Sequence, residues 1–205
     1  MTTDPLPREI PLLPLGPRQA APAARTLALA FADDPLVTRI CPDPATRLTL
    51  IEPVFHYTAR LAAANGQAWA VGATPDGVSL WLPSWRMGCA PWRWFLYGGH
   101  RVGRGMEPRH YRLLNEVSSV IDRERDRVAP RRYLYLSNLG VLPAARRQGL
   151  ATALVLPPVQ EAARQGLPTL VETNTPASLA FYRAVGFRVI NDFQAYGMEY
   201  YVLRA

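Results

Sequence analysis

The sequence predicts a mixed α/β fold in a single domain that spans residues 1–205. Strand-like and helix-like segments alternate regularly through the last third of the chain, and crossovers of this length join neighbouring parallel strands. The chain has 205 residues, of which 49% are hydrophobic. This length suits one sizeable core better than two.

The expected elements follow from hydrophobic periodicity and from turn-forming residues. Prolines confine a strand within residues 8–16 to the edge of a sheet, and the stretch 33–35 is a helix stop. We expect the following elements in order: an edge strand within 8–16, helices at 24–36 and 44–65, a hairpin of strands 67–73 and 78–82, and a helix at 110–128. The last third adds a strand at 132–141, a helix at 149–166, a strand at 169–174, a short helix at 178–187 and a strand pair within 188–203.

The charge of the chain narrows the classes of function. The net charge of +7 comes entirely from Arg, because the sequence contains no Lys. A P-loop phosphate lysine and a Schiff-base lysine are therefore excluded, so anions must be held by Arg and backbone amides. The Arg residues are scattered along the chain without a basic stripe, and nucleic-acid binding is not expected.

No apolar run is long enough to span a membrane, and the proline-rich start does not read as a secretory signal. We expect a cytoplasmic protein that does not bind membranes. Cys41 and Cys89 stand far apart and predict neither a zinc site nor a disulfide framework. His56, His100 and His110 stand singly, no G-x-S-x-G appears, and we expect no metal and no hydrolase nucleophile.

The stretch Leu139–Leu154 carries the strongest chemical signal. After a strand ending at Val141, the residues Arg146-Arg147-Gln148-Gly149-Leu150-Ala151 enter a helix, whose first backbone N–H groups have no intrahelical partner. These groups and the helix dipole favour an anion. Gly149 and Ala151 are small enough for a pyrophosphate to approach the backbone, and the two Arg add positive charge.

This arrangement resembles the acetyl-CoA site of the GNAT superfamily of N-acetyltransferases, whose signature is Q/R-x-x-G-x-G/A after a strand and a V-x-P turn. Arg146, Gly149 and Ala151 match it, preceded by Val141-Leu142-Pro143. The segment 181–187, FYRAVGF, is similar to a second family motif, (L/F)-Y-x-x-x-G-F. Weaker matches at residues 31–35, 78–81, 156–159 and 170–173 resemble the bacterial branch that contains puromycin N-acetyltransferase.

The resemblance implies the GNAT fold, with helices flanking a central mixed, mostly antiparallel sheet that contains a splayed pair of parallel strands. The pantetheine arm of acetyl-CoA would insert at the splay. By resemblance, Leu139, Gly140 and Val141 contact the pantetheine and the acetyl carbonyl, and the amide near Leu139 stabilises the oxyanion. The pyrophosphate would be held by Arg146, Arg147, Gln148, Gly149, Leu150, Ala151 and Thr152.

Tyr182 matches the family tyrosine that acts as general acid to the leaving thiolate. The superfamily commonly has Asn seven residues earlier, where this chain has Thr175. Asn174 and Ser178 both stay candidates for the pantetheine contact. Attack also requires a neutral amine, and hence a general base or a water relay.

The general base can be sought among the carboxylates and tyrosines near the expected cleft. Glu172 shares a strand face with Asn174 and is the first candidate. Glu116 and Tyr135 are weaker ones. A salt bridge to one of the many Arg residues is the alternative role for Glu172.

The expected function is transfer of an acetyl group from acetyl-CoA to a primary amine of a small molecule, by direct attack in a ternary complex. The branch resemblance implies an antibiotic or another natural product as acceptor. The alternatives are a non-catalytic acyl-CoA-binding module and an acetyltransferase for protein amines or polyamines. Trp85, Trp92, Trp94 and Tyr97 would suit an aromatic acceptor if they line the cleft. A monomer and a homodimer are both compatible with the sequence.

Overall fold

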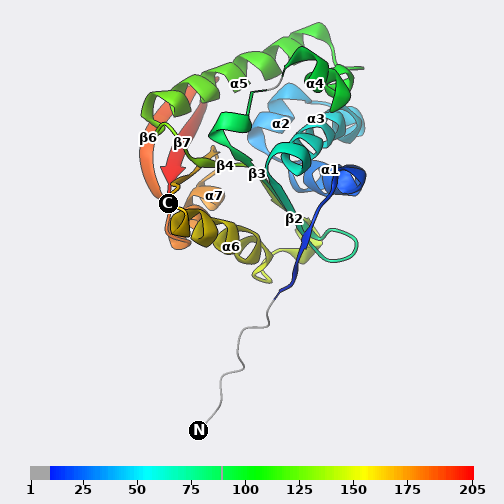
Figure 1. Ribbon diagram of the computed structural model, residues 1–205. Coiled ribbons are helices and arrows are strands. Elements are labelled where there is room, and N and C mark those ends of the chain that lie inside the picture. The colour runs from blue at the N-terminus through cyan, green and yellow to red at the C-terminus, as the bar shows by residue number, and fades with distance from the viewer. Residues whose placement is uncertain (1–9, 89) are drawn as a thin grey trace.

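The computed structural model describes residues 10–88 and 90–205 and shows a sheet covered by helices (Figure 1). The predicted thiol of Cys89 lies outside the described residues, as do the first two residues of the predicted edge strand. The strands are β1 (Leu12–Pro14), β2 (Gln67–Val71), β3 (Gly77–Pro83), β4 (Leu134–Val141), β5 (Thr169–Thr173), β6 (Arg188–Ala195) and β7 (Met198–Arg204). The helices are α1 (Ala20–Ala30), α2 (Pro35–Ile40), α3 (Pro44–Asn65), α4 (Pro91–Leu96), α5 (Pro108–Val128), α6 (Leu150–Arg164) and α7 (Pro176–Ala184).

The sheet confirms the predicted fold class. Its order is β1-β2-β3-β4-β5-β7-β6, with β1 at an edge, and every neighbouring pair is antiparallel except β4 and β5. In the described chain, β4 and β5 pair only through Leu134 with Thr169 and Tyr135 with Leu170. Beyond Tyr135 the two strands separate, as the resemblance to the GNAT fold implies.

The predicted helix at 24–36 is wrong, because two helices occupy this region. The α1 helix ends at Ala30, and Asp34 caps α2 by accepting from the amides of Leu36 and Val37 at 2.9 and 3.3 Å. Pro35 takes the first helical position, where its missing N–H costs no hydrogen bond. Pro35, which the sequence predicts to end a helix, is therefore the first residue of α2.

The two faces of the sheet carry different helices (Figure 1). The α1 and α3 helices pack over β2 and β3 on one face, where Leu27, Phe55, Val78 and Leu80 share a core cluster. The α6 and α7 helices cover the opposite face. Among residues 10–88 and 90–205, we find no helix with the length and hydrophobicity needed to span a bilayer.

A bulge in β4 changes which side chains point to each face. The pairing with β3 steps from Leu136 to Asn138, which leaves Ser137 without a partner. Before the bulge, Leu136 belongs to the cluster on the α6 side. After it, Leu139 packs there and Gly140 lies under α1, so the alternation has shifted by one residue. The bulge occurs where β4 leaves β5.

Candidate active site

Two hollows meet where β4 and β5 separate. The first, which we call the splay groove, has a volume of about 450 Å³ and is lined by β4, α7 and the end of α1. The second, which we call the core cavity, has a volume of about 240 Å³ and lies under α2, α3 and α5. Phe31 and Asp34 line both, so the two hollows adjoin at these residues.

The turn between β4 and α6 contains two residues with left-handed backbone conformation. Arg147 has φ 62° and Gly149 has φ 79°, both in the left-handed region. Left-handed residues in a turn of this kind aim successive N–H groups into an anion-binding concavity. In the described part of the chain, no hydrogen bond engages the amides of residues 147–152. The predicted anion site thus has free donors at a helix N-terminus.

Arg146 holds this turn against α1. Its guanidinium donates to the Ala30 carbonyl at 3.0 Å and to the Val141 carbonyl at 3.4 Å. Gly140 lies where α1 crosses β4, and a Cβ there would be 2.9 Å from both the Ala30 and Leu27 side chains. Only glycine allows α1 to come this close to β4. The wall of the splay groove therefore depends on two sequence-predicted residues.

Tyr182 lines the splay groove from α7 and is buried. Its ring packs against Phe181 and Phe187, with centroid distances of 5.2 and 5.5 Å. Burial, followed by repulsion from Glu172, raises the pKa of the Tyr182 hydroxyl. The hydroxyl is consequently protonated at neutral pH and can donate a proton.

Glu172 lines the core cavity from β5, and its side chain is only 6% exposed. Burial raises the pKa of its carboxyl to about 7, although Arg125 and a hydrogen bond from Tyr135 act to lower it. The Glu172 Oε1 and Arg125 Nη1 atoms lie 3.5 Å apart. Within the described residues neither atom has a hydrogen-bond partner, so Oε1 keeps its capacity to accept a proton.

Arg125 is the residue that sequence reasoning missed. It is 3% exposed and reaches from α5 toward Glu172, with its guanidinium 4.7 Å above the Tyr135 ring. Its nitrogens also donate to Asp122 at 2.8 Å and to the Tyr133 hydroxyl at 3.0 Å. The only signal in the sequence was the position of this Arg on the apolar side of an amphipathic helix. An Arg in such a helix is ordinarily expected to be exposed to solvent.

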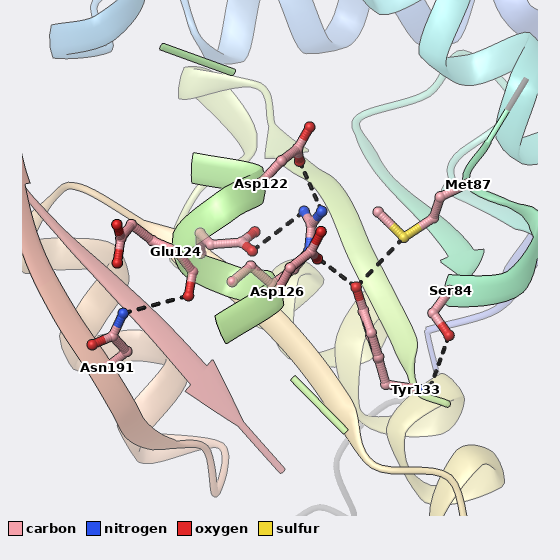
Figure 2. A network of polar contacts seen from close by, with 9 residues as sticks. Ser84, Met87, Asp122, Glu124, Asp126, Tyr133 and Asn191 are labelled. Atoms are coloured by element: carbon pink, nitrogen blue, oxygen red, sulfur yellow. Dashed lines mark hydrogen bonds and ion pairs between the residues drawn. The ribbon is translucent and has the colours of Figure 1, made fainter. Parts of the chain in front are cut away.

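Figure 2 shows the surroundings of this guanidinium. Asp122 and Asp126 approach it from α5, and the Tyr133 hydroxyl lies beside it. That hydroxyl in turn contacts the sulfur of Met87 at 3.8 Å. Contacts from several directions fix the cation that stands next to Glu172.

Some of the remaining predicted residues line one of the two hollows, and others line neither. Leu139, Val141, Ala151 and Ser178 line the splay groove, where the Ser178 hydroxyl accepts from Thr175 Oγ1 at 2.9 Å. Asn174 lines the core cavity instead. Leu150 is buried in a core cluster and offers the turn only its backbone amide. The side chains of Arg147, Gln148 and Thr152 line neither hollow.

Several residues considered for the acceptor side lie outside both hollows. Glu116 is exposed on α5 and lines neither hollow, whereas Tyr135 lines the core cavity. The tryptophans Trp85, Trp92 and Trp94 are also exposed outside both hollows. Tyr97 is buried and receives a hydrogen bond from Asn65. The condition that these four aromatic residues line the cleft is therefore not met in the two hollows. Among the described residues we find no cluster of His, Cys, Asp and Glu arranged to hold a metal ion.

The acetyltransferase (GNAT) family model matches residues 96–187. The match includes the amide-bearing turn, Glu172 and Tyr182, and it ends at Phe187, the last residue of the second GNAT motif. It covers less than half of the chain. Over this stretch the chain is therefore similar to the acetyltransferase (GNAT) family, and its fold is consistent with the GNAT fold. The finer likeness to the puromycin branch stays a prediction.

Solved structures share the fold over nearly the whole chain. One described as histone acetyltransferase HPA2 and related acetyltransferase, from Corynebacterium glutamicum, is 17% identical with a TM-score of 0.64, over 94% of this chain and 93% of that one. A mosquito arylalkylamine N-acetyltransferase like 5b is 11% identical with a TM-score of 0.61, over 95% and 98%. The Escherichia coli ribosomal-protein-S18-alanine N-acetyltransferase is 13% identical with a TM-score of 0.54, over 95% and 91%. Their names cover protein and small-amine acceptors, and at these identities the likeness concerns the fold alone.

Proposed function

We propose that the protein transfers an acetyl group from acetyl-CoA to a primary amine of a small molecule, by direct attack in a ternary complex. One observation carries the proposal. A groove lined by Tyr182 and, at the turn with unbonded backbone amides, by Arg146 and Ala151 adjoins a cavity that contains a buried carboxylate, Glu172. Such an arrangement separates an anionic cofactor from an amine acceptor and lets them meet at one point.

The splay groove fits acetyl-CoA, which when bound supplies an activated acetyl thioester. The amides of residues 147–152 would bind the pyrophosphate, and Arg146 adds positive charge beside them. Past Tyr135, β4 has no strand partner on the β5 side in the described chain. The backbone groups of residues 139 and 140 are therefore available to pair with the pantetheine arm, whereas the Val141 carbonyl already accepts from Arg146. Ser178 lies in this groove and Asn174 does not, which favours Ser178 for a side-chain contact.

Glu172 would act as the general base. A primary amine is an ammonium ion in neutral water and must lose a proton before it attacks. A carboxyl whose pKa is about 7 is half ionised near neutral pH and accepts that proton far more readily than an ordinary carboxylate. Arg125 keeps a fraction of Glu172 ionised against the cost of burial, and so acts as a positioning residue.

Tyr182 would act as the general acid. Glu172 accepts the first proton, which the ammonium ion loses before attack. As the C–N bond forms and the C–S bond breaks, the nitrogen loses a second proton to solvent and the Tyr182 hydroxyl donates one to the departing sulfur. The tyrosinate is then reprotonated and Glu172 deprotonated by solvent, so the products are the amide, the CoA thiol and one released proton. The Tyr182 hydroxyl is protonated at neutral pH, and burial raises its pKa further.

Calorimetry with acetyl-CoA and a thiol-release assay over a panel of primary amines test the proposal. We expect binding of acetyl-CoA and amine-dependent release of free CoA thiol, with mass-spectrometric detection of the acetylated amine. Binding without thiol release on any amine would favour the non-catalytic acyl-CoA-binding module. Absence of binding heat would remove the cofactor assignment itself.

A further inference from the structure

The inference concerns the acceptor and rests on the proposed function. The core cavity has an apolar roof made by several elements. Its apolar lining consists of Phe31, Leu36, Val37, Ile40, Ile51, Val54, Phe55, Met106, Leu114 and Ile121. The floor is formed by the sheet and is polar, with Glu172, Asn174 and Tyr200 among its residues. A molecule that fills this space must be apolar over most of its surface and polar at one end.

The charged residues in the lining of the core cavity have one sign. Asp34 and Glu172 are the two charged residues that line the cavity in the described chain. Asp34 lies where the cavity adjoins the splay groove, and Glu172 lies on the sheet floor. Burial raises the pKa of Asp34, although the two amides that it caps act in the opposite direction. Asp34 Oδ1 is already engaged as the cap of α2, whereas Glu172 Oε1, 3.5 Å from the Arg125 guanidinium, has no hydrogen-bond partner among the described residues. One ammonium group can therefore pair with Glu172 on the floor, while the apolar side chains of the roof offer no partner for a second.

The size of the cavity limits the acceptor further. An apolar cavity of about 150 Å³ holds benzene, and the core cavity has about 240 Å³. The additional space fits a short amine-bearing arm. It does not fit a folded protein surface or a second large ring system.

We infer that the acceptor is a compact primary monoamine with a single apolar body, alkyl or aryl, and not a polyamine or a large amino-nucleoside. The apolar side chains of the roof would pack against the apolar body, and Glu172 on the floor would bind the ammonium group. A polyamine would have to place its second ammonium against aliphatic side chains, and burying an unpaired charge in this way is strongly unfavourable.

Two matched pairs of amines test the inference in the thiol-release assay. Hexylamine and 1,6-diaminohexane differ by one terminal ammonium, and 2-phenylethylamine and puromycin differ in bulk. We expect kcat/KM to be about 100-fold higher or more for the first member of each pair. Faster turnover of the diamine or of puromycin would overturn the inference and leave acetyl transfer intact. No thiol release with any amine would overturn both.

A change in the roof separates cavity filling from general damage. Val54→Phe narrows the cavity from α3 at a half-buried position. We expect kcat/KM for 2-phenylethylamine to fall about 10-fold or more, with unchanged acetyl-CoA affinity. Leu114→Phe narrows it from α5 and should act in the same direction. Val120→Phe, a half-buried α5 position that lies outside this lining, is the matched control and should leave kcat/KM unchanged. Equal rates in all three variants would show that the acceptor does not occupy the cavity.

Discussion

The splay groove and the core cavity differ in the atoms that form them: the groove depends on backbone groups at one end, and the cavity depends on side chains. The proposed anion site at the end of the groove consists of backbone amides from one continuous stretch, 147–152, in a conformation that Gly149 makes accessible. The cavity uses side chains from six helices and strands that are far apart in sequence. A site made by local backbone has a local motif, whereas a site made by distant side chains has none. The sequence therefore predicts the proposed cofactor site much better than it predicts the proposed acceptor site.

Gly149→Val should have the largest effect, because it acts on the backbone site. A β-branched residue at φ 79° is strained by about 1–3 kcal/mol. Relief of this strain would turn the amides away, and the side chain would itself obstruct the pyrophosphate. We expect no detectable heat with acetyl-CoA in calorimetry.

The matched control for this variant lies at the other end of α6. Gly166 has φ 69°, and a Cβ there meets nothing within 4 Å. Gly166→Val should lose a similar amount of thermal stability, yet bind acetyl-CoA normally. Equal loss of binding in both variants would mean that general destabilisation, and not the turn, controls affinity.

Tyr182→Phe comes next and removes only a hydroxyl. The ring keeps its contacts with Phe181 and Phe187, so folding should be preserved. We expect kcat to fall about 100-fold, the lower end of general acid catalysis, while the acetyl-CoA dissociation constant stays nearly the same. Tyr97→Phe removes a buried hydroxyl outside both hollows and is the control. Unchanged turnover in Tyr182→Phe would remove this tyrosine from the mechanism.

Most of the fold could be predicted because its signals are local. The hairpin turn at residues 74–77, the helix that closes on Asn65 and Gly66, and the last strand pair were all found where periodicity and turn residues placed them. The region 24–36 was misread because a helix stop and a helix start share the same residues, Asp34 and Pro35. Whether Asp34 caps a following helix depends on the amides of Leu36 and Val37, and hence on the fold.

The candidate site could be predicted only in part, for the same reason. Glu172 and Tyr182 came from a strand position and from a motif, and the structure places them in the two adjoining hollows. Arg125 lies 47 positions before Glu172 and is brought to it only by the packing of α5 over the sheet. The bulge at Ser137 likewise depends on pairing with β3. Neither feature has a short-range sequence pattern.

The pH dependence of turnover tests the cavity side. Glu172 must be ionised to accept a proton, and its pKa is about 7. Catalytic rate should therefore rise with pH through about 7 and level off above it. Glu172→Gln should lower kcat/KM about 30-fold at pH 8, because water replaces the base only poorly, and should abolish this limb. A limb that persists in the variant would assign the base to another group.

The smallest expected effects are shifts of that limb, and their signs distinguish electrostatics from damage. Arg125 lowers the Glu172 pKa and Asp122 raises it. Arg125→Gln should therefore move the limb to higher pH, on the order of one unit for a buried charge. Asp122→Asn should move it to lower pH by roughly a few tenths of a unit, because the Asp122 carboxylate is 58% exposed and solvent screens it. Glu124→Gln, on the same helix but paired with Arg127, is the control and should leave the limb in place.

Loss of packing around α5 would move the limb of both variants in the same direction. Opposite shifts in the pH–rate profiles can therefore arise only if the charges of Arg125 and Asp122 set the ionisation of Glu172.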